Sequence, residues 1–184
     1  MRVSFVIPCY QEAETLASWA GHLPQVEADE IVFVDDGSCD GTAEVLARLA
    51  MADARVQVVR HAHNRGVGAA MRTGFEASRG DVVVVYDADL TYPLVDAARL
   101  VARLDEAFVD VVTATPFGAG GGLDGVPWRR RILSQGARLA WRITVGERAR
   151  DVTCFTCAFR AYRRSALAGL AFEADGFAAA AEMS

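Results

Sequence analysis

Short apolar runs of strand character alternate with helical patterns along the first 115 residues, and this alternation constrains the fold more than any other feature. The fourth run has the strongest strand character, because four consecutive valines stand between Asp81 and Tyr86. Runs of this kind are typical of strands buried on both faces of a parallel sheet. We therefore predict a single α/β domain with a doubly wound, mostly parallel sheet flanked by helices.

The element boundaries follow from the apolar periodicity. The predicted strands lie at residues 3–7, 30–34, 56–59, 81–86 and 109–114. The predicted helices lie at 12–21, 42–51, 66–78 and 96–107, and Asp40 is the expected N-cap of the second. Later residues predict a glycine-rich loop over 117–125, a helix over 128–145, a strand over 153–162 and a short helix over 163–170.

The composition excludes several classes of protein. A chain of 184 residues with 52% hydrophobic and 23% charged residues is not a disordered tail, and its four cysteines are too few for a disulfide scaffold. No apolar run approaches the roughly 20 residues of a membrane-spanning helix, and the N-terminal run is too short for a signal peptide. We therefore expect a cytoplasmic location and a reduced compartment.

The charge is divided unevenly along the chain. Residues 1–127 carry a formal charge of −10, residues 128–164 carry +8 and residues 165–184 carry −3, which together give the net charge of −5. All 19 basic residues are arginines, and arginine binds phosphate in a bidentate manner that lysine cannot match. This division predicts a metal site in the acidic part beside an anion site in the arginine-rich part.

Polar residues follow three of the predicted strands. Asp87 and Asp89 come directly after the fourth strand, and two carboxylates at positions i and i+2 of an extended backbone project the same way. Such a pair can hold one hard divalent cation and leave positions open for phosphate oxygens. Asp35 and Asp36 follow the second strand, where a carboxylate can accept hydrogen bonds from a nucleobase or ribose or can cap a helix. Ligands of doubly wound sheets bind at these carboxyl ends.

Six stretches resemble the motifs of family 2 glycosyltransferases, in the order in which that family has them. VIPCYQE at residues 6–12 resembles "IPxYNE", and VDDGSCDGT at 34–42 resembles "VDDGSxDGT". NRGVGAA at 64–70 resembles "NxGxxxA", and YDADLTYP at 86–93 resembles the "DADLQxPP" of dolichol-phosphate mannose synthases and related polyprenyl-phosphate sugar transferases. Residues 151–164 resemble "DxTSGFRAYRR", and 176–182 match "GFxxxxE".

The resemblance implies a GT-A fold that performs an inverting sugar transfer from a nucleotide-sugar donor, with Mg²⁺ or Mn²⁺ as cofactor. Asp87 and Asp89 would hold the metal and act in catalysis together with Arg130. The residues that would bind the nucleotide part of the donor are Pro8, Tyr10, Glu12, Asp35 and Asp36. Residues 1–115 would form the nucleotide-sugar and metal half of the domain, and residues 116–184 an acceptor half that ends early relative to the family.

The resemblance also suggests the acceptor, a polyprenyl or dolichyl phosphate at the cytosolic face of a membrane, with the enzyme bound peripherally and no nucleic-acid partner. Arg130 and Ser134, four residues apart on one helix face, would contact its phosphate, and Arg160 is a third expected acceptor contact. Two alternatives stay open. The same fold can transfer sugar to a hydroxyl acceptor with Asp175 or Glu182 as base, or the chain can be a non-catalytic sugar-nucleotide-binding protein.

Three further patterns are expected to have no catalytic role. The glycine run at 120–125 lies too late in the chain for a dinucleotide-binding turn. The pair Cys154 and Cys157 lacks the second pair that a zinc site needs. His61 and His63 follow the third strand, and both are expected to face solvent rather than a metal.

Overall fold

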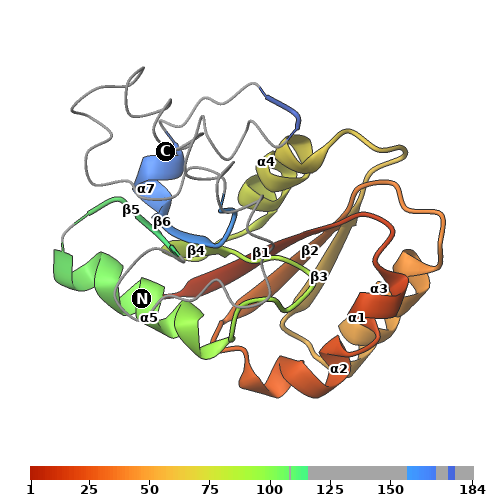
Figure 1. Ribbon diagram of the computed structural model, residues 1–184, viewed down its shortest axis with the longest axis horizontal. Helices are drawn as coiled ribbons and strands as arrows, with labels where there is room; N and C mark the ends of the chain where they lie inside the picture. Colours follow the sequence, from red (N-terminus) through yellow and green to blue (C-terminus); the bar gives the residue numbers. More distant parts are fainter. Residues whose placement is uncertain (108, 116–156, 169–173, 177–184) are drawn as a thin grey trace, which may run out of the picture.

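The computed structural model describes residues 1–107, 109–115, 157–168 and 174–176. These residues form a six-stranded sheet of order β3-β2-β1-β4-β6-β5 (Figure 1). Four strands are parallel: β1 (Val3–Cys9), β2 (Glu30–Asp35), β3 (Val56–Arg60) and β4 (Val82–Val85). β6 (Arg160–Arg163) lies between β4 and β5 (Val111–Thr113) and is antiparallel to both. The predicted mostly parallel α/β sheet is confirmed.

Helices cover both faces of the sheet (Figure 1). On one face lie α1 (Ala13–Leu16), α2 (Trp19–His22), α3 (Thr42–Ala52) and α5 (Val95–Ala107), and on the other lie α4 (Val67–Ala77) and α7 (Arg164–Leu167). Successive side chains of β1 alternate between the two cores: Phe5 and Ile7 pack with the first group of helices, and Val6 packs with α4. The sheet is therefore buried on both faces, as its apolar runs predict.

The predicted single helix over residues 12–21 is wrong. The chain forms α1, α2 and a 3₁₀ turn (Leu23–Gln25) instead. The break occurs at Ser18, whose backbone N–H and hydroxyl both donate to the carbonyl of Thr15, at 3.3 and 2.9 Å. This local side-chain bond competes with the regular helical pattern.

The predicted N-cap of α3 is wrong by one residue. Gly41 takes the N-cap position, with φ of +96°. Asp40 still stabilises the start of the helix, because its Oδ1 accepts bonds from the backbone N–H of Thr42 at 3.1 Å and from the Thr42 hydroxyl at 2.6 Å. The hydroxyl bond is the main reason why the pKa of Asp40 is lowered.

The other predicted elements of the first 115 residues are present, with ends shifted by up to two residues. Of the predicted strand over 153–162, residues 153–156 lie outside the described part, residues 157–159 are not strand, and β6 begins at Arg160. The predicted short helix appears as α7. The predicted glycine-rich loop over 117–125 and helix over 128–145 lie outside the described residues. Within the part of the chain that the structure describes, no helix is long and apolar enough to span a membrane.

Candidate nucleotide and metal site

The carboxyl ends of β1, β2 and β4 meet at one end of the sheet. In the parallel register, Cys9 of β1 lies beside Asp35 of β2, and Val6 lies beside Val85 of β4. The pairing continues one residue past the end of β2, because the N–H of Asp36 donates to the carbonyl of Cys9 at 2.8 Å. The predicted nucleotide-binding and metal-binding residues therefore lie on adjacent strands.

A cavity of about 280 Å³ opens at this end of the sheet, beside β1, β2 and α4. Its lining includes three of the residues that the sequence assigned to the nucleotide: Pro8, Tyr10 and Asp36. It also includes residues that were given no role: Cys9, Asn64, Gly66, Val67, Ala70 and Gly176. The signal for four of these was present in the stretch NRGVGAA at residues 64–70, whose resemblance to a family motif carried no assigned role.

Asp35 and Asp36, the two carboxylates at the end of β2, make different contacts. Asp35 is fully buried, with Oδ1 accepting from the N–H of Ser38 at 2.9 Å and Oδ2 lying 3.1 Å from Nε of Arg60. Asp35 therefore stabilises the turn after β2, and it does not line the cavity. Asp36 lines the cavity, but both of its oxygens accept bonds from the protein.

Glu12 lies at the start of α1, where it is half-buried. Its backbone N–H donates to the Thr42 hydroxyl at 2.9 Å, and the neighbouring N–H of Gln11 donates to Oγ of Ser38 at 2.9 Å. These bonds join the segment after β1 to the turn after β2. Tyr10 is exposed at the mouth of the cavity, at 45% of its full surface.

The loop that carries Asp87 and Asp89 is held from two sides. On the side of α2, Nε1 of the fully buried Trp19 donates to the carbonyl of Ala88 at 2.8 Å. Within the loop, the N–H of Thr91 donates to Oδ1 of Asp89 at 2.9 Å, and Leu90 adopts a left-handed φ of +55°. These constraints fix the backbone of both predicted metal ligands.

Aromatic packing supports the same loop. Tyr86 packs edge-on against Trp19 and Phe159, with ring centroids 5.9 and 5.1 Å away, and its hydroxyl donates to the carbonyl of Tyr92. Burial, with Asp89 and then Asp87 adding to it, raises the pKa of Tyr86 to about 12, which keeps the phenol protonated as a donor. Phe159 reaches this cluster from a segment far along the chain.

The charges at the loop suit a divalent cation. Burial, followed by repulsion from Asp89, raises the pKa of Asp87 to about 6. A cation bound beside Asp87 would favour its ionised form and so offset this effect. Among the described residues no group of three or more His, Cys, Asp or Glu side chains gathers around a metal position, so the remaining ligands would be water and phosphate oxygens. Mg²⁺ is commonly bound in this way.

A pH dependence of metal binding follows from the raised pKa of Asp87. A metal binds the ionised carboxylate, so protonation competes with it as the pH falls through about 6. We expect Mn²⁺ affinity to rise roughly fivefold from pH 5 to pH 6 and about twofold more by pH 8. Titration of free Mn²⁺ by electron paramagnetic resonance measures this, and an affinity that is constant from pH 5 to pH 8 would contradict the assignment.

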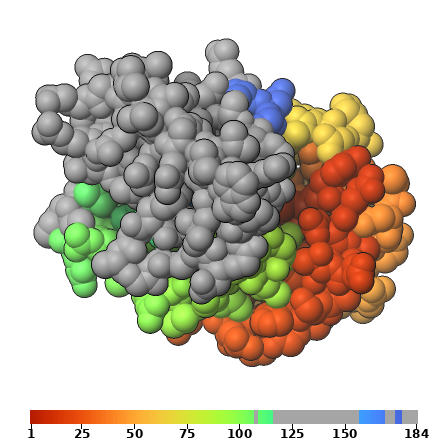
Figure 2. Space-filling view, in the orientation of Figure 1, coloured from red at the N-terminus to blue at the C-terminus, as the bar shows by residue number. Residues whose placement is uncertain are grey.

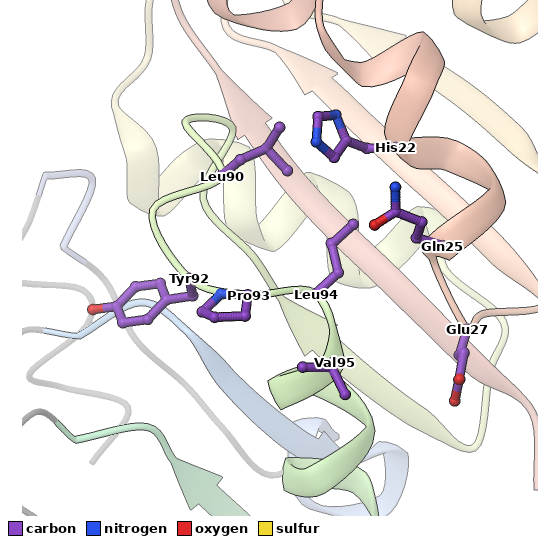
Figure 3. Close-up of a pocket in the computed structure, with 8 residues that line it drawn as sticks. All are labelled: His22, Gln25, Glu27, Leu90, Tyr92, Pro93, Leu94 and Val95. Atoms are coloured by element: carbon purple, nitrogen blue, oxygen red, sulfur yellow. The ribbon is translucent and has the colours of Figure 1, made fainter. Parts of the chain in front are cut away.

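A second cavity, of about 350 Å³, lies on the other side of the loop (Figure 3). Its walls come from α2 and the segment after it, and from the residues between Asp89 and α5. Leu90, Leu94 and His22 point toward it, whereas the Tyr92 hydroxyl points away and lies 3.3 Å from Sγ of Cys157. The sequence did not predict this cavity.

Residues 174–176 lie against the start of α4, where their blue atoms touch the yellow ones in Figure 2. The carbonyl of Asp175 accepts from the N–H of Gly68 at 2.7 Å, and Arg72 forms an ion pair with the Asp175 carboxylate. Gly176 lines the nucleotide-side cavity. The proposed base of the hydroxyl-acceptor alternative, Asp175, is therefore already paired with a cation.

The predicted acceptor residues are only partly described. Arg160 is fully buried, and its Nε donates to the carbonyl of Cys157 at 2.8 Å. Arg130 and Ser134 lie outside the described residues, as do Glu182 and Cys154.

The expected exposure of both histidines is wrong for one of them. His63 is exposed, but His61 is buried, with 7% of its surface accessible. Its ring bonds Asp36 and Thr73.

Comparison with known proteins identifies the family. The profile described as "Glycosyl transferase family 2" matches residues 4–170. The chain belongs to glycosyl transferase family 2. Its relatives within or near this family include the polyprenol monophosphomannose synthase of Mycolicibacterium smegmatis, 37% identical over 90% of this chain and 63% of that protein. The dolichol-phosphate mannosyltransferase of Pyrococcus furiosus is 31% identical over 96% of this chain and 50% of that protein.

A third relative is the undecaprenyl-phosphate 4-deoxy-4-formamido-L-arabinose transferase of Salmonella, 34% identical over 89% of this chain and 49% of that protein. The chain thus spans about half to two thirds of the length of these relatives. Among solved structures, glucosyl-3-phosphoglycerate synthase of Mycobacterium tuberculosis with Mg²⁺ and UDP has a TM-score of 0.74 and 25% identity, covering 99% of this chain and 63% of that one. The predicted GT-A fold is confirmed.

Proposed function

We propose that this chain carries out an inverting transfer of a sugar from a nucleotide-sugar donor to a polyprenyl phosphate, at the cytosolic face of a membrane. The observation that supports this most is that the 280 Å³ cavity and the Asp87–Asp89 pair lie at the same end of the sheet, beside adjacent strands. Three relatives whose names specify polyprenol, dolichol-phosphate or undecaprenyl-phosphate sugar transfer support the same acceptor class.

The donor would lie across β1, with its nucleoside in the cavity and its diphosphate toward β4. Pro8 and Tyr10 would contact the nucleoside, and the turn before α4, with Asn64 and Gly66, would form another wall of its pocket. Asp87 and Asp89 would hold Mg²⁺ or Mn²⁺, which offsets the charge of the leaving nucleoside diphosphate when bound. The structure of the M. tuberculosis relative holds Mg²⁺ together with UDP, in accord with this arrangement.

The acceptor phosphate would attack the sugar from the opposite side. A phosphate monoester is ionised at neutral pH, so it needs no strong general base to attack C1. Because Arg160 is buried and bonded to Cys157, Arg130 and Ser134 would make the phosphate contact. Asp175, the candidate base for a hydroxyl acceptor, forms an ion pair with Arg72, whereas a phosphate acceptor needs no such base, and this favours the phosphate acceptor.

An acceptor panel tests this proposal. The protein is incubated with Mn²⁺ and labelled GDP-mannose, UDP-glucose or UDP-N-acetylglucosamine, and with either a detergent-solubilised polyprenyl phosphate or soluble saccharides and peptides. We expect label from at least one donor to enter the organic phase only when both the lipid phosphate and the metal are present. Transfer to the hydroxyl acceptors alone would contradict the proposal and support the alternative.

A further inference from the structure

His61 is buried between three elements of the fold. It follows β3 directly, and its backbone N–H donates to the carbonyl of Asp35 at 2.8 Å, which extends the β2–β3 ladder by one position. Its Nδ1 lies 2.6 Å from Oδ1 of Asp36, and its Nε2 lies 2.9 Å from Oγ1 of Thr73 on α4. The imidazole thus joins the ends of β2 and β3 to the helix beside the nucleotide cavity.

The hydrogen-bond pattern assigns a direction to this contact. Asp36 accepts at both oxygens, so the proton of the 2.6 Å bond belongs to Nδ1 of His61. The same Oδ1 accepts from the N–H of Arg65 at 2.9 Å, and Oδ2 accepts from the N–H of Gly66 at 2.8 Å. Through Asp36, the imidazole therefore holds the backbone that forms one wall of the cavity.

The backbone at that wall has little freedom to move. Gly66 has a φ of +92°, and Gly37, with a φ of +75°, lies so close to the loop that an added Cβ would stand 2.4 Å from the backbone of His63. Asp36 is 3% exposed, so its carboxylate depends on protein donors for compensation. Losing one donor from a buried carboxylate costs more than losing one at the surface.

We propose that His61, held by Thr73, is a positioning residue of the nucleoside pocket: it orients Asp36, which in turn holds the backbone of Arg65 and Gly66 in place at the wall of the pocket. The inference rests on the proposed function only for the identity of the ligand. The positioning itself is a property of the protein without ligand, and it can be measured there.

The test compares His61→Leu with His61→Asn. The two substituted side chains have nearly the same shape, but only the asparagine amide can donate to Asp36 in place of Nδ1. We expect His61→Leu to weaken binding of UDP or GDP at least about tenfold in Mn²⁺, and His61→Asn to recover most of this loss. Mn²⁺ affinity without nucleotide should stay within about twofold for both, because the metal ligands follow a different strand.

Amide hydrogen exchange of the unliganded protein is the second measurement. His61→Leu should speed exchange at Arg65 and Gly66, and His61→Asn should restore their protection. Leu49→Ala serves as a control, since it also destabilises the core but lies on α3, on the opposite face of the sheet. In Leu49→Ala, the amides of Arg65 and Gly66 should exchange no faster than global unfolding of this variant accounts for. Its nucleotide affinity should equal that of the wild-type protein.

The outcomes separate the two proposals. If His61→Leu leaves the exchange of Arg65 and Gly66 unchanged relative to Leu49→Ala, the positioning role is wrong, whatever the protein binds. If the exchange changes as expected but the wild-type protein binds neither nucleotide, the positioning role stands and the donor proposal fails.

Discussion

Replacing Asp89 by Asn should lower sugar transfer by at least about 100-fold while the protein stays folded. Asp89 is exposed at the carboxyl end of the sheet, and its carboxylate accepts a bond from the backbone N–H of Thr91. An asparagine oxygen can still accept that bond, so the loop should keep its shape while the charge for the metal is lost. Initial rates at saturating Mn²⁺, with circular dichroism of the variant, measure the two effects separately.

Glu106→Gln is the matched control for this variant. It removes the same charge from an exposed position on α5, where the carboxylate lies 3.7 Å from Arg103 in a surface ion pair. Such pairs contribute little to stability, and this one lies away from the metal loop, so the rate should stay within about twofold of wild type. Full activity of Asp89→Asn would refute the assignment of Asp89 as a metal ligand.

Gly66→Ala should weaken nucleotide binding at least about tenfold and lower the free energy of unfolding by about 1–3 kcal/mol. Its φ of +92° lies in a region that residues with a Cβ rarely adopt. The added Cβ would also stand 2.3 Å from the carbonyl oxygen of Asp175, so the backbone of one of these segments must shift. Because Gly66 lines the nucleotide-side cavity and donates to Asp36, either shift changes the pocket.

Gly21→Ala is the control for the effect of a methyl group. An added Cβ at Gly21, within α2, would meet nothing within 4 Å. We expect unchanged nucleotide affinity and a small gain in stability, since alanine has the higher helix propensity. Isothermal titration with UDP and GDP in Mn²⁺, together with urea denaturation, measures both variants. Wild-type affinity in Gly66→Ala would show that the wall before α4 does not shape the nucleotide site.

The sheet and the metal loop could be predicted because their signals are local. The four valines before Tyr86 specify a buried strand, and the spacing of Asp87 and Asp89 places two carboxylates at its end. The break at Ser18 also has a local cause, the bond from its hydroxyl to the carbonyl of Thr15. The apolar pattern fits a broken helix and a continuous helix equally well, so it could not predict the break. The antiparallel insertion of β6 depends on pairing between distant segments, which periodicity does not encode.

The nucleotide site was harder to predict, because its residues are distinguished by long-range contacts. Asp35 and Asp36 are adjacent and identical, yet one braces a turn and the other lines the cavity. The burial of His61 depends on the register of β3 beside β2 and on Thr73 of α4, neither of which its own neighbours reveal. Gly176 joins the cavity from a segment more than 100 residues beyond Gly66, through contacts of Asp175 and Arg72.

Metal-dependent nucleotide binding tests the central claim most directly, namely that the cavity and the Asp87–Asp89 pair form one donor site. UDP and GDP are titrated into the wild-type protein and into Asp89→Asn, each with and without Mn²⁺. We predict that at least one nucleotide binds the wild-type protein at least about tenfold more tightly with Mn²⁺, and that Asp89→Asn removes this difference. Nucleotide binding that is equally tight with and without Mn²⁺, or absent in both, would contradict the account.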